Sequence, residues 1–110
     1  MKFDHIAIQV KNQDIKGTAA WYKNNMSANI LYLDDTWALL DVFDLRLALV
    51  LPTQHPPHIA FKINEAQYLD FKKASKTFKK HRDGSESFYE KDISGNILEF
   101  VFWKKIGQEN

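Results

Sequence analysis

Apolar and polar residues alternate in two similar segments of the chain. Residues 4–10 read Asp-His-Ile-Ala-Ile-Gln-Val, and residues 57–63 repeat this pattern as Pro-His-Ile-Ala-Phe-Lys-Ile. Alternation with a period of two predicts a β-strand in each segment. Because the repeat length is near half of the chain, the pattern indicates two copies of one supersecondary unit.

A helical pattern follows each of these strands. The apolar residues of the first recur at helical spacing: Ile15, Ala19, Tyr22 and Met26. Those of the second share one face: Phe71, Ala74 and Phe78. Asp14 is placed to cap the first helix, and Asn64 with Gln67 forms a variant of the capping box at the start of the second.

Short strands account for the remainder of each half. The first half predicts strands at 29–33, 36–43 and 45–51, and the second predicts a loop at 81–84 followed by strands at 85–92 and 97–103. Each half therefore has the order βαβββ, although less clearly in the second. At 110 residues the chain is expected to be one α+β domain, residues 1–110, with modules at about 1–52 and 57–104 and a tail at 105–110.

Composition removes several classes of function. The chain has no cysteine, which excludes disulfides and thiol chemistry and leaves His and carboxylates as metal ligands. The net charge of +1 does not provide the positive field that nucleic acid requires, so no nucleic-acid partner is expected. No apolar run approaches the ~20 residues of a membrane span, and the strand pattern at the start takes the place of a signal peptide, so we expect a cytoplasmic protein without a membrane partner.

Strand alternation places three potential metal ligands on one side of the sheet. Side chains along a strand point to opposite faces in turn, so His5 lies opposite the residues expected to pack under the first helix: Ile6, Ile8 and Val10. His58 likewise lies opposite the second apolar set: Ile59, Phe61 and Ile63. In the last strand Glu99 shares its face with Val101 and Trp103, away from the more apolar stripe: Leu98, Phe100 and Phe102.

Four segments together resemble the vicinal oxygen chelate superfamily, which includes glyoxalases, bleomycin-resistance proteins and extradiol dioxygenases. They are the opening at 4–10, the aromatic pair Trp21-Tyr22, the segment His-Ile-Ala-Phe at 58–61, and the ending Asp-Ile-Ser-Gly-Asn-Ile-Leu-Glu-Phe at 92–100. The ending is the most specific. The resemblance covers nearly the whole chain and implies two βαβββ modules that form an eight-stranded, curved mixed sheet, or cup, with a helix packed outside each module.

The resemblance also implies a site and a partner. It places His5, His58 and Glu99 at the metal positions of the superfamily, for a divalent ion of Fe, Mn, Ni, Co or Zn. A small-molecule substrate or ligand and a homodimer are implied as well. Members build the cup either within one chain or across two, and the sequence leaves both arrangements open.

One departure from the superfamily pattern limits the reactions that the resemblance implies. Many members take a fourth ligand from the last strand of the first module, but here that strand would present Arg46, Ala48 and Val50 to the cup. Glyoxalase I uses a ligating glutamate as its base, so that particular reaction is in doubt. The resemblance thus implies a metal-dependent lyase or isomerase, transferase or dioxygenase that binds vicinal oxygens of its substrate. The alternative is a non-catalytic, bleomycin-resistance-like binding pocket.

Two further residues are weaker catalytic candidates. Arg46 would hold an anionic group of a substrate, or would simply pair at the surface with Asp41 or Asp44. His55 would act as an acid-base group or would be an exposed loop residue. The lysine-rich face of the second helix predicts a solvated surface.

Overall fold

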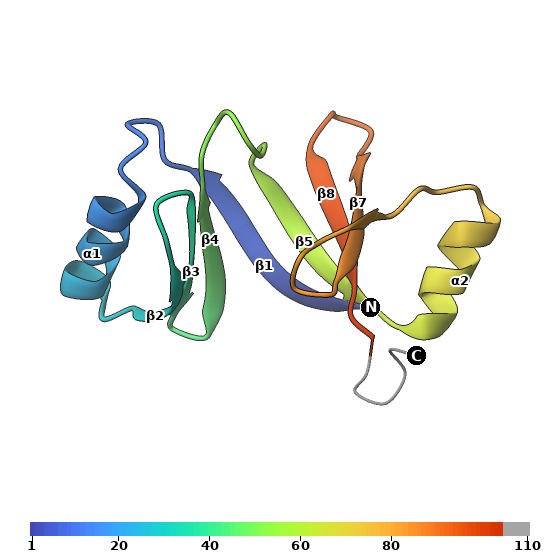
Figure 1. The fold of residues 1–110 in the computed structure, drawn as a ribbon, viewed down its shortest axis with the longest axis horizontal. Coiled ribbons are helices and arrows are strands. Elements are labelled where there is room, and N and C mark those ends of the chain that lie inside the picture. The colour runs from blue at the N-terminus through green and yellow to red at the C-terminus, as the bar shows by residue number, and fades with distance from the viewer. Residues whose placement is uncertain (105–110) are drawn as a thin grey trace. The chain divides into compact units, whose positions relative to one another are not determined.

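The computed structural model describes residues 1–104, so the expected tail at 105–110 lies outside the described residues. Within them the elements follow one another in this order: β1 (Lys2–Gln9), α1 (Ile15–Met26), β2 (Asn29–Leu33), β3 (Trp37–Val42), β4 (Leu45–Val50), β5 (His58–Ile63), α2 (Glu65–Lys73), β6 (Lys79–Lys80), β7 (Glu86–Lys91) and β8 (Ile97–Phe102) (Figure 1). Both halves have the predicted βαβββ order, although β6 of the second half was not among the strands located from the sequence.

The strands of the described residues belong to one eight-stranded sheet of order β2-β3-β4-β1-β5-β8-β7-β6. The sheet is mixed, since β1 runs parallel to β4 while the hairpin partners are antiparallel. This confirms the α+β fold with an eight-stranded mixed sheet. The chain also divides into two compact units: the first unit is His5–Ile59, and the second unit combines Met1–Asp4 with the residues from Ala60 onward.

The core of the first unit lies between α1 and its side of the sheet. Ile15 and Ala19 of α1 pack in one cluster with Leu40, Leu47 and Leu49, and Ile6 and Ile8 pack against this cluster. Figure 1 shows α1 (blue) beside β2, β3 and β4. As predicted, Asp14 caps the helix, because its Oδ1 accepts a hydrogen bond of 2.9 Å from the Gly17 backbone N–H.

The opposite face of the first unit carries a second, smaller cluster. It consists of Ala7, Ala48 and Val50, with Leu39 packed against it. The register pairs Ala7 with Ala48 on β1 and β4. The alternation of side chains in this unit is therefore the one predicted from the sequence.

An aromatic core fills the second unit. Tyr68 of α2 stacks on Phe102 of β8, with ring centroids 4.1 Å apart, and Phe71 contacts both Phe88 and Phe100. Offset and edge-to-face contacts of this kind stabilise a core beyond the area that they bury. Phe100 and Phe102 thus lie on the helix side of β8, as predicted.

The second helix is shorter than its apolar pattern suggests. It begins at the predicted capping box of Asn64 and Gln67 but ends at Lys73. Ser75 adopts a left-handed φ of 68°, and the next backbone N–H, of Lys76, bonds back to the Phe71 carbonyl, which closes the helix in the manner of a Schellman motif. Phe78, expected on the helix, therefore reaches the core from the following segment.

Two other details differ from the expectation. The two-residue strand β6 occupies positions next to the predicted loop, where two lysines give no strand signal. Ile59, expected to pack inward, is 40% exposed at the start of β5.

Among the described residues, no helix has the length and apolar character to span a membrane.

The β7–β8 hairpin is fixed by the turn at residues 92–96. The Asp92 carboxylate accepts hydrogen bonds from the backbone N–H groups of Ser94 and Asn96 and from the Asn96 side chain. Gly95 has a φ of +87°, which a residue with a Cβ rarely adopts. These bonds hold the pKa of Asp92 below its usual value, the Asn96 side chain contributing most. The turn sets a register in which Glu99 lies opposite Tyr89.

Candidate metal centre

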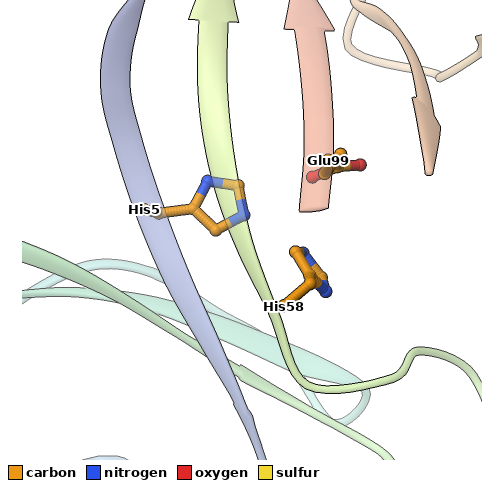
Figure 2. Close-up of side chains that lie close together, drawn as sticks. All are labelled: His5, His58 and Glu99. Atoms are coloured by element: carbon orange, nitrogen blue, oxygen red, sulfur yellow. The ribbon is translucent and has the colours of Figure 1, made fainter. Parts of the chain in front are cut away.

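His5 and His58 lie together in the first unit. His5 is on β1 and His58 is on β5, and their ring centroids are 5.5 Å apart with the planes at 73° (Figure 2). His58 is buried and His5 is half-buried. Two histidines from the two copies of the sequence repeat therefore come side by side, as the repeat predicted.

The protonation of His58 follows from its backbone contact. Its Nδ1 lies 2.8 Å from the Pro56 carbonyl oxygen. A carbonyl oxygen can only accept, so Nδ1 must carry the proton. In the neutral ring the lone pair then resides on Nε2, which is the arrangement of a metal-binding histidine whose second nitrogen donates to a backbone carbonyl.

The loop that precedes His58 is attached to β1. Gln9, on the same face of β1 as His5, donates a hydrogen bond of 3.0 Å from its Nε2 to the His55 carbonyl oxygen. The loop thereby gains a fixed position just before Pro56 and His58. His55 contributes to this arrangement through its backbone, and a catalytic role for its half-buried side chain stays a prediction.

Arg46 lies at the exposed start of β4. The register places it opposite Asp41 of β3, and the buried part of β4 begins at the next residue, Leu47. An exposed position suits the surface pair with Asp41 or Asp44 that the sequence suggested. Tight recognition of a substrate anion would need a buried arginine. An anion-binding role for Arg46 stays a prediction.

Glu99 is a buried carboxylate on β8, with 8% of its surface exposed. Its Oε2 accepts a hydrogen bond of 2.8 Å from Ser87 Oγ of β7, and the Ser87 hydroxyl lies 2.6 Å from His81 Nε2. Buried carboxylates require such partners. Ser87 and His81 escaped the sequence reasoning, although the alternation of residues 85–92 would have placed Ser87 on the Glu99 face once the register was known.

Tyr89 is a second neighbour of Glu99 on β7. Partial burial of Tyr89, which is 43% exposed, raises the pKa of its phenol above the usual value, and the negative charge of Glu99 raises this pKa further. Tyr89 therefore remains a neutral phenol throughout the physiological range and can donate a hydrogen bond there.

The donor set fits a divalent transition metal. Two imidazoles and one carboxylate suit Fe, Mn, Co, Ni or Zn and leave coordination positions open. The face of β4 that could carry a fourth ligand holds Ala48 and Val50, which are buried with Ala7. Neither side chain has a ligand atom, and the three-ligand set stays a prediction.

Comparison with known proteins rests on structure alone. No family model matches the sequence, and no curated protein matches it. Methylmalonyl-CoA epimerase from Mycobacterium tuberculosis has a TM-score of 0.72 at 17% identity, with 96% of this chain and 89% of the epimerase covered. A glyoxalase/bleomycin resistance protein/dioxygenase superfamily member from Vibrio splendidus has a TM-score of 0.67 at 8% identity, with 92% and 99% covered.

A third structure carries a metal. The Mn(II)-bound glyoxalase from Novosphingobium aromaticivorans has a TM-score of 0.64 at 16% identity, with 92% of this chain and 37% of the glyoxalase covered. At these identities the likeness establishes the fold. The chain thus has the fold of the glyoxalase, bleomycin resistance and dioxygenase superfamily, as its sequence pattern predicted.

Proposed function

We propose that His5, His58 and Glu99 bind one divalent metal ion and that this ion binds neighbouring oxygens of a small-molecule substrate. One observation carries the proposal: His5 and His58 lie side by side with ring centroids 5.5 Å apart, and His58 presents Nε2 as a ligand atom. Glu99 adds a buried carboxylate held by Ser87. Figure 2 shows the side chains on β1, β5 and β8. The ion would be Fe, Mn, Co, Ni or Zn, since the ligand types suit all of them.

The residues of the chain would each have a defined part in this site. Pro56 holds His58 in the tautomer that presents Nε2, and Ser87 holds one oxygen of Glu99. Tyr89 supplies a phenol that stays protonated. When bound, the metal would supply Lewis-acid polarisation of a substrate oxygen or a site for dioxygen.

Similar structures support a small-molecule partner. One is a methylmalonyl-CoA epimerase in complex with methylmalonyl-CoA, which has a TM-score of 0.64 and 17% identity to this chain. Another is the Mn(II)-bound glyoxalase. The proposal therefore places this chain among metal-dependent lyases or isomerases, transferases or dioxygenases of the same fold, with the reaction left open.

A second candidate function is non-catalytic binding of a small ligand, as in bleomycin-resistance proteins. It is favoured by the small apolar residues Ala48 and Val50 on the face where a fourth ligand or basic carboxylate would lie. Metal binding separates the two functions, because the pocket protein needs no ion.

The test is a thermal shift with single metals. Protein freed of metal with a chelator should gain thermal stability on addition of Mn, Fe, Co, Ni or Zn, since an ion that binds only the folded state stabilises it. His58→Ala should abolish the gain. His55→Ala is the matched control, because it removes a histidine from the loop just before β5 and should leave the gain intact. A full response in His58→Ala, or no response of the unmodified chain to any of the metals, would contradict the proposal.

The edge strand β2 supports the expected homodimer. It lies at one end of the strand order, and its apolar residues Ile30, Leu31 and Leu33 are 36%, 47% and 37% exposed. An edge with exposed apolar side chains is suited to pairing with another chain, and we propose a second copy as that partner. Light scattering should show a dimer that Leu31→Lys converts to a monomer. A monomeric unmodified chain, or a dimer in the variant, would refute this interface. The cytoplasmic location stays an expectation from the sequence.

A further inference from the structure

A row of hydrogen bonds links Glu99 to a histidine outside the proposed ligand set. Ser87 Oγ is 2.8 Å from Glu99 Oε2 and 2.6 Å from His81 Nε2. Glu99 and Ser87 are 8% and 4% exposed, and His81 is half-buried. These three side chains all belong to the second unit.

The direction of donation along the row is determined by the serine. A hydroxyl has one proton, and Ser87 gives it to the Glu99 carboxylate. Ser87 can then only accept from His81, so His81 Nε2 must carry a proton. The row therefore runs from His81 Nε2–H to Ser87 Oγ–H to Glu99 Oε2.

The local fold brings His81 to this place. Lys79 of β6 lies opposite Ser87 of β7, and a tight turn follows, in which the His81 N–H bonds to the Ser85 carbonyl at 2.9 Å. Asp83 accepts from both the backbone N–H and the hydroxyl of Ser85, and Gly84 has a φ of +91°. The turn leads the chain from His81 directly into β7, so His81 lies beside the strand that carries Ser87.

We propose that Ser87 and His81 are positioning residues for the metal ligand Glu99. This inference rests on the proposed function, since it concerns the same ion. Ser87 holds Oε2 and thereby fixes the orientation of the carboxylate that would bind the ion. His81 orients the Ser87 hydroxyl by occupying its acceptor position. Outer partners of this kind orient metal ligands and tune their affinity.

The main test is Mn(II) affinity, followed by electron paramagnetic resonance of the free ion. Ser87→Ala should weaken Mn(II) binding by roughly 10- to 100-fold, the usual effect of removing an outer partner of a ligand. Ser87→Thr retains the hydroxyl and should bind as the unmodified chain does. Tyr68→Phe is the matched control, because it removes another buried hydroxyl that donates to a buried carboxylate, Glu86, at 2.9 Å on the opposite face. Its Mn(II) affinity should be unchanged.

Variants of His81 extend the test to the outer end of the row. His81→Gln keeps an N–H donor of similar reach and should retain most of the affinity, whereas His81→Leu should lose about tenfold. The Co(II) absorption spectrum should change in Ser87→Ala and His81→Leu, because a freed carboxylate alters the coordination geometry. A variant that was only less stable would bind less Co(II) with an unchanged spectrum, so a changed spectrum shows that Ser87 and His81 position Glu99.

The possible failures are distinct. If the unmodified chain binds neither Mn(II) nor Co(II) and gains no thermal stability from Fe, Ni or Zn, the proposed function fails. If the unmodified chain binds both ions, and Ser87→Ala and His81→Leu match its affinity and spectrum, the proposed function stands and this inference is overturned. Should Ser87→Ala not fold, His81→Leu decides, since it alters a half-buried side chain at the end of the row.

Discussion

The Glu99→Gln variant distinguishes a metal-binding role of Glu99 from a purely structural one. Glu99 is 8% exposed and carries a charge that must be desolvated in the metal-free protein. Glutamine has nearly the same shape, and its amide oxygen can still accept the Ser87 hydrogen bond. Burial of a charge costs more free energy than burial of a neutral, hydrogen-bonded amide, so the metal-free variant should melt at the same temperature or higher.

The loss appears only when metal is added. An ion at one hundred times its Kd stabilises the unmodified chain by about 2.7 kcal/mol, which is roughly 10 to 20 °C for a domain of this size. If the substitution weakens binding about 100-fold, the same metal concentration equals the new Kd and leaves only about 0.4 kcal/mol, or roughly 2 °C. The expected signature is an unchanged or raised melting temperature without metal and an almost absent response to metal.

Differential scanning calorimetry with and without Mn(II) or Zn(II) measures both quantities. Glu86→Gln is the matched control, because Glu86 is also a buried glutamate of the same sheet with one hydroxyl partner, Tyr68, but on the helix face. It should keep the full response to metal. The reasoning is refuted if Glu99→Gln responds to metal as the unmodified chain does, or if the metal-free variant loses several degrees.

Three further predictions concern the fold. Leu40→Ala should cost about 3 kcal/mol of unfolding free energy in urea titrations, because Leu40 is fully buried in the core under α1 and the truncation leaves a cavity; a cost under about 1 kcal/mol would contradict that packing. Asn64→Ala should cost about 1 kcal/mol by removing the capping box of α2, as urea titration followed by circular dichroism would show, while the exposed Asn29→Ala should cost little. Hydrogen bonds from Tyr32 first, and then from Thr36 and Trp37, hold the pKa of Asp34 far below its usual range; this contribution is present above the unfolded pKa of about 4 and is lost as pH falls toward the folded value. Asp34→Asn should therefore reduce stability by about 1 kcal/mol at pH 7, after solvent screening, and by less at pH 2, and an equal loss at both values would refute the assignment.

The sequence predicted the fold because its local signals agree with one another. The alternation around His5 and His58, the caps at Asp14 and Asn64, and the turn at Gly95 each specify a structure over a few residues, and the repeat relates the two halves. The second helix was overestimated because a left-handed residue at Ser75 ends it, and serine gives no strong signal for that conformation. β6 was missed because its pairing depends on the neighbouring strand rather than on its own residues.

The three residues of the candidate site could be named from the sequence, and their role as metal ligands stays a prediction. The alternation of side chains along a strand assigns His5, His58 and Glu99 to one face of the sheet, and this requires no knowledge of how the strands are paired. Their partners required the register itself: Ser87 reaches Glu99 only because Glu99 lies opposite Tyr89, and His81 reaches Ser87 only through a turn. Hydrogen bonds between residues on different elements are set by tertiary geometry, which a single sequence does not specify.

The turn at residues 92–96 has a consequence for how such sequences are read. Asp92, Ser94, Gly95 and Asn96 hydrogen-bond with one another within the turn, and the turn determines how β8 lies against β7. A slip of one residue would direct Glu99 into the aromatic core and Phe100 out of it. The turn motif thus fixes the alignment of β8 with β7. Found in another chain without the two histidines, it would argue for the same hairpin and would say nothing about a metal.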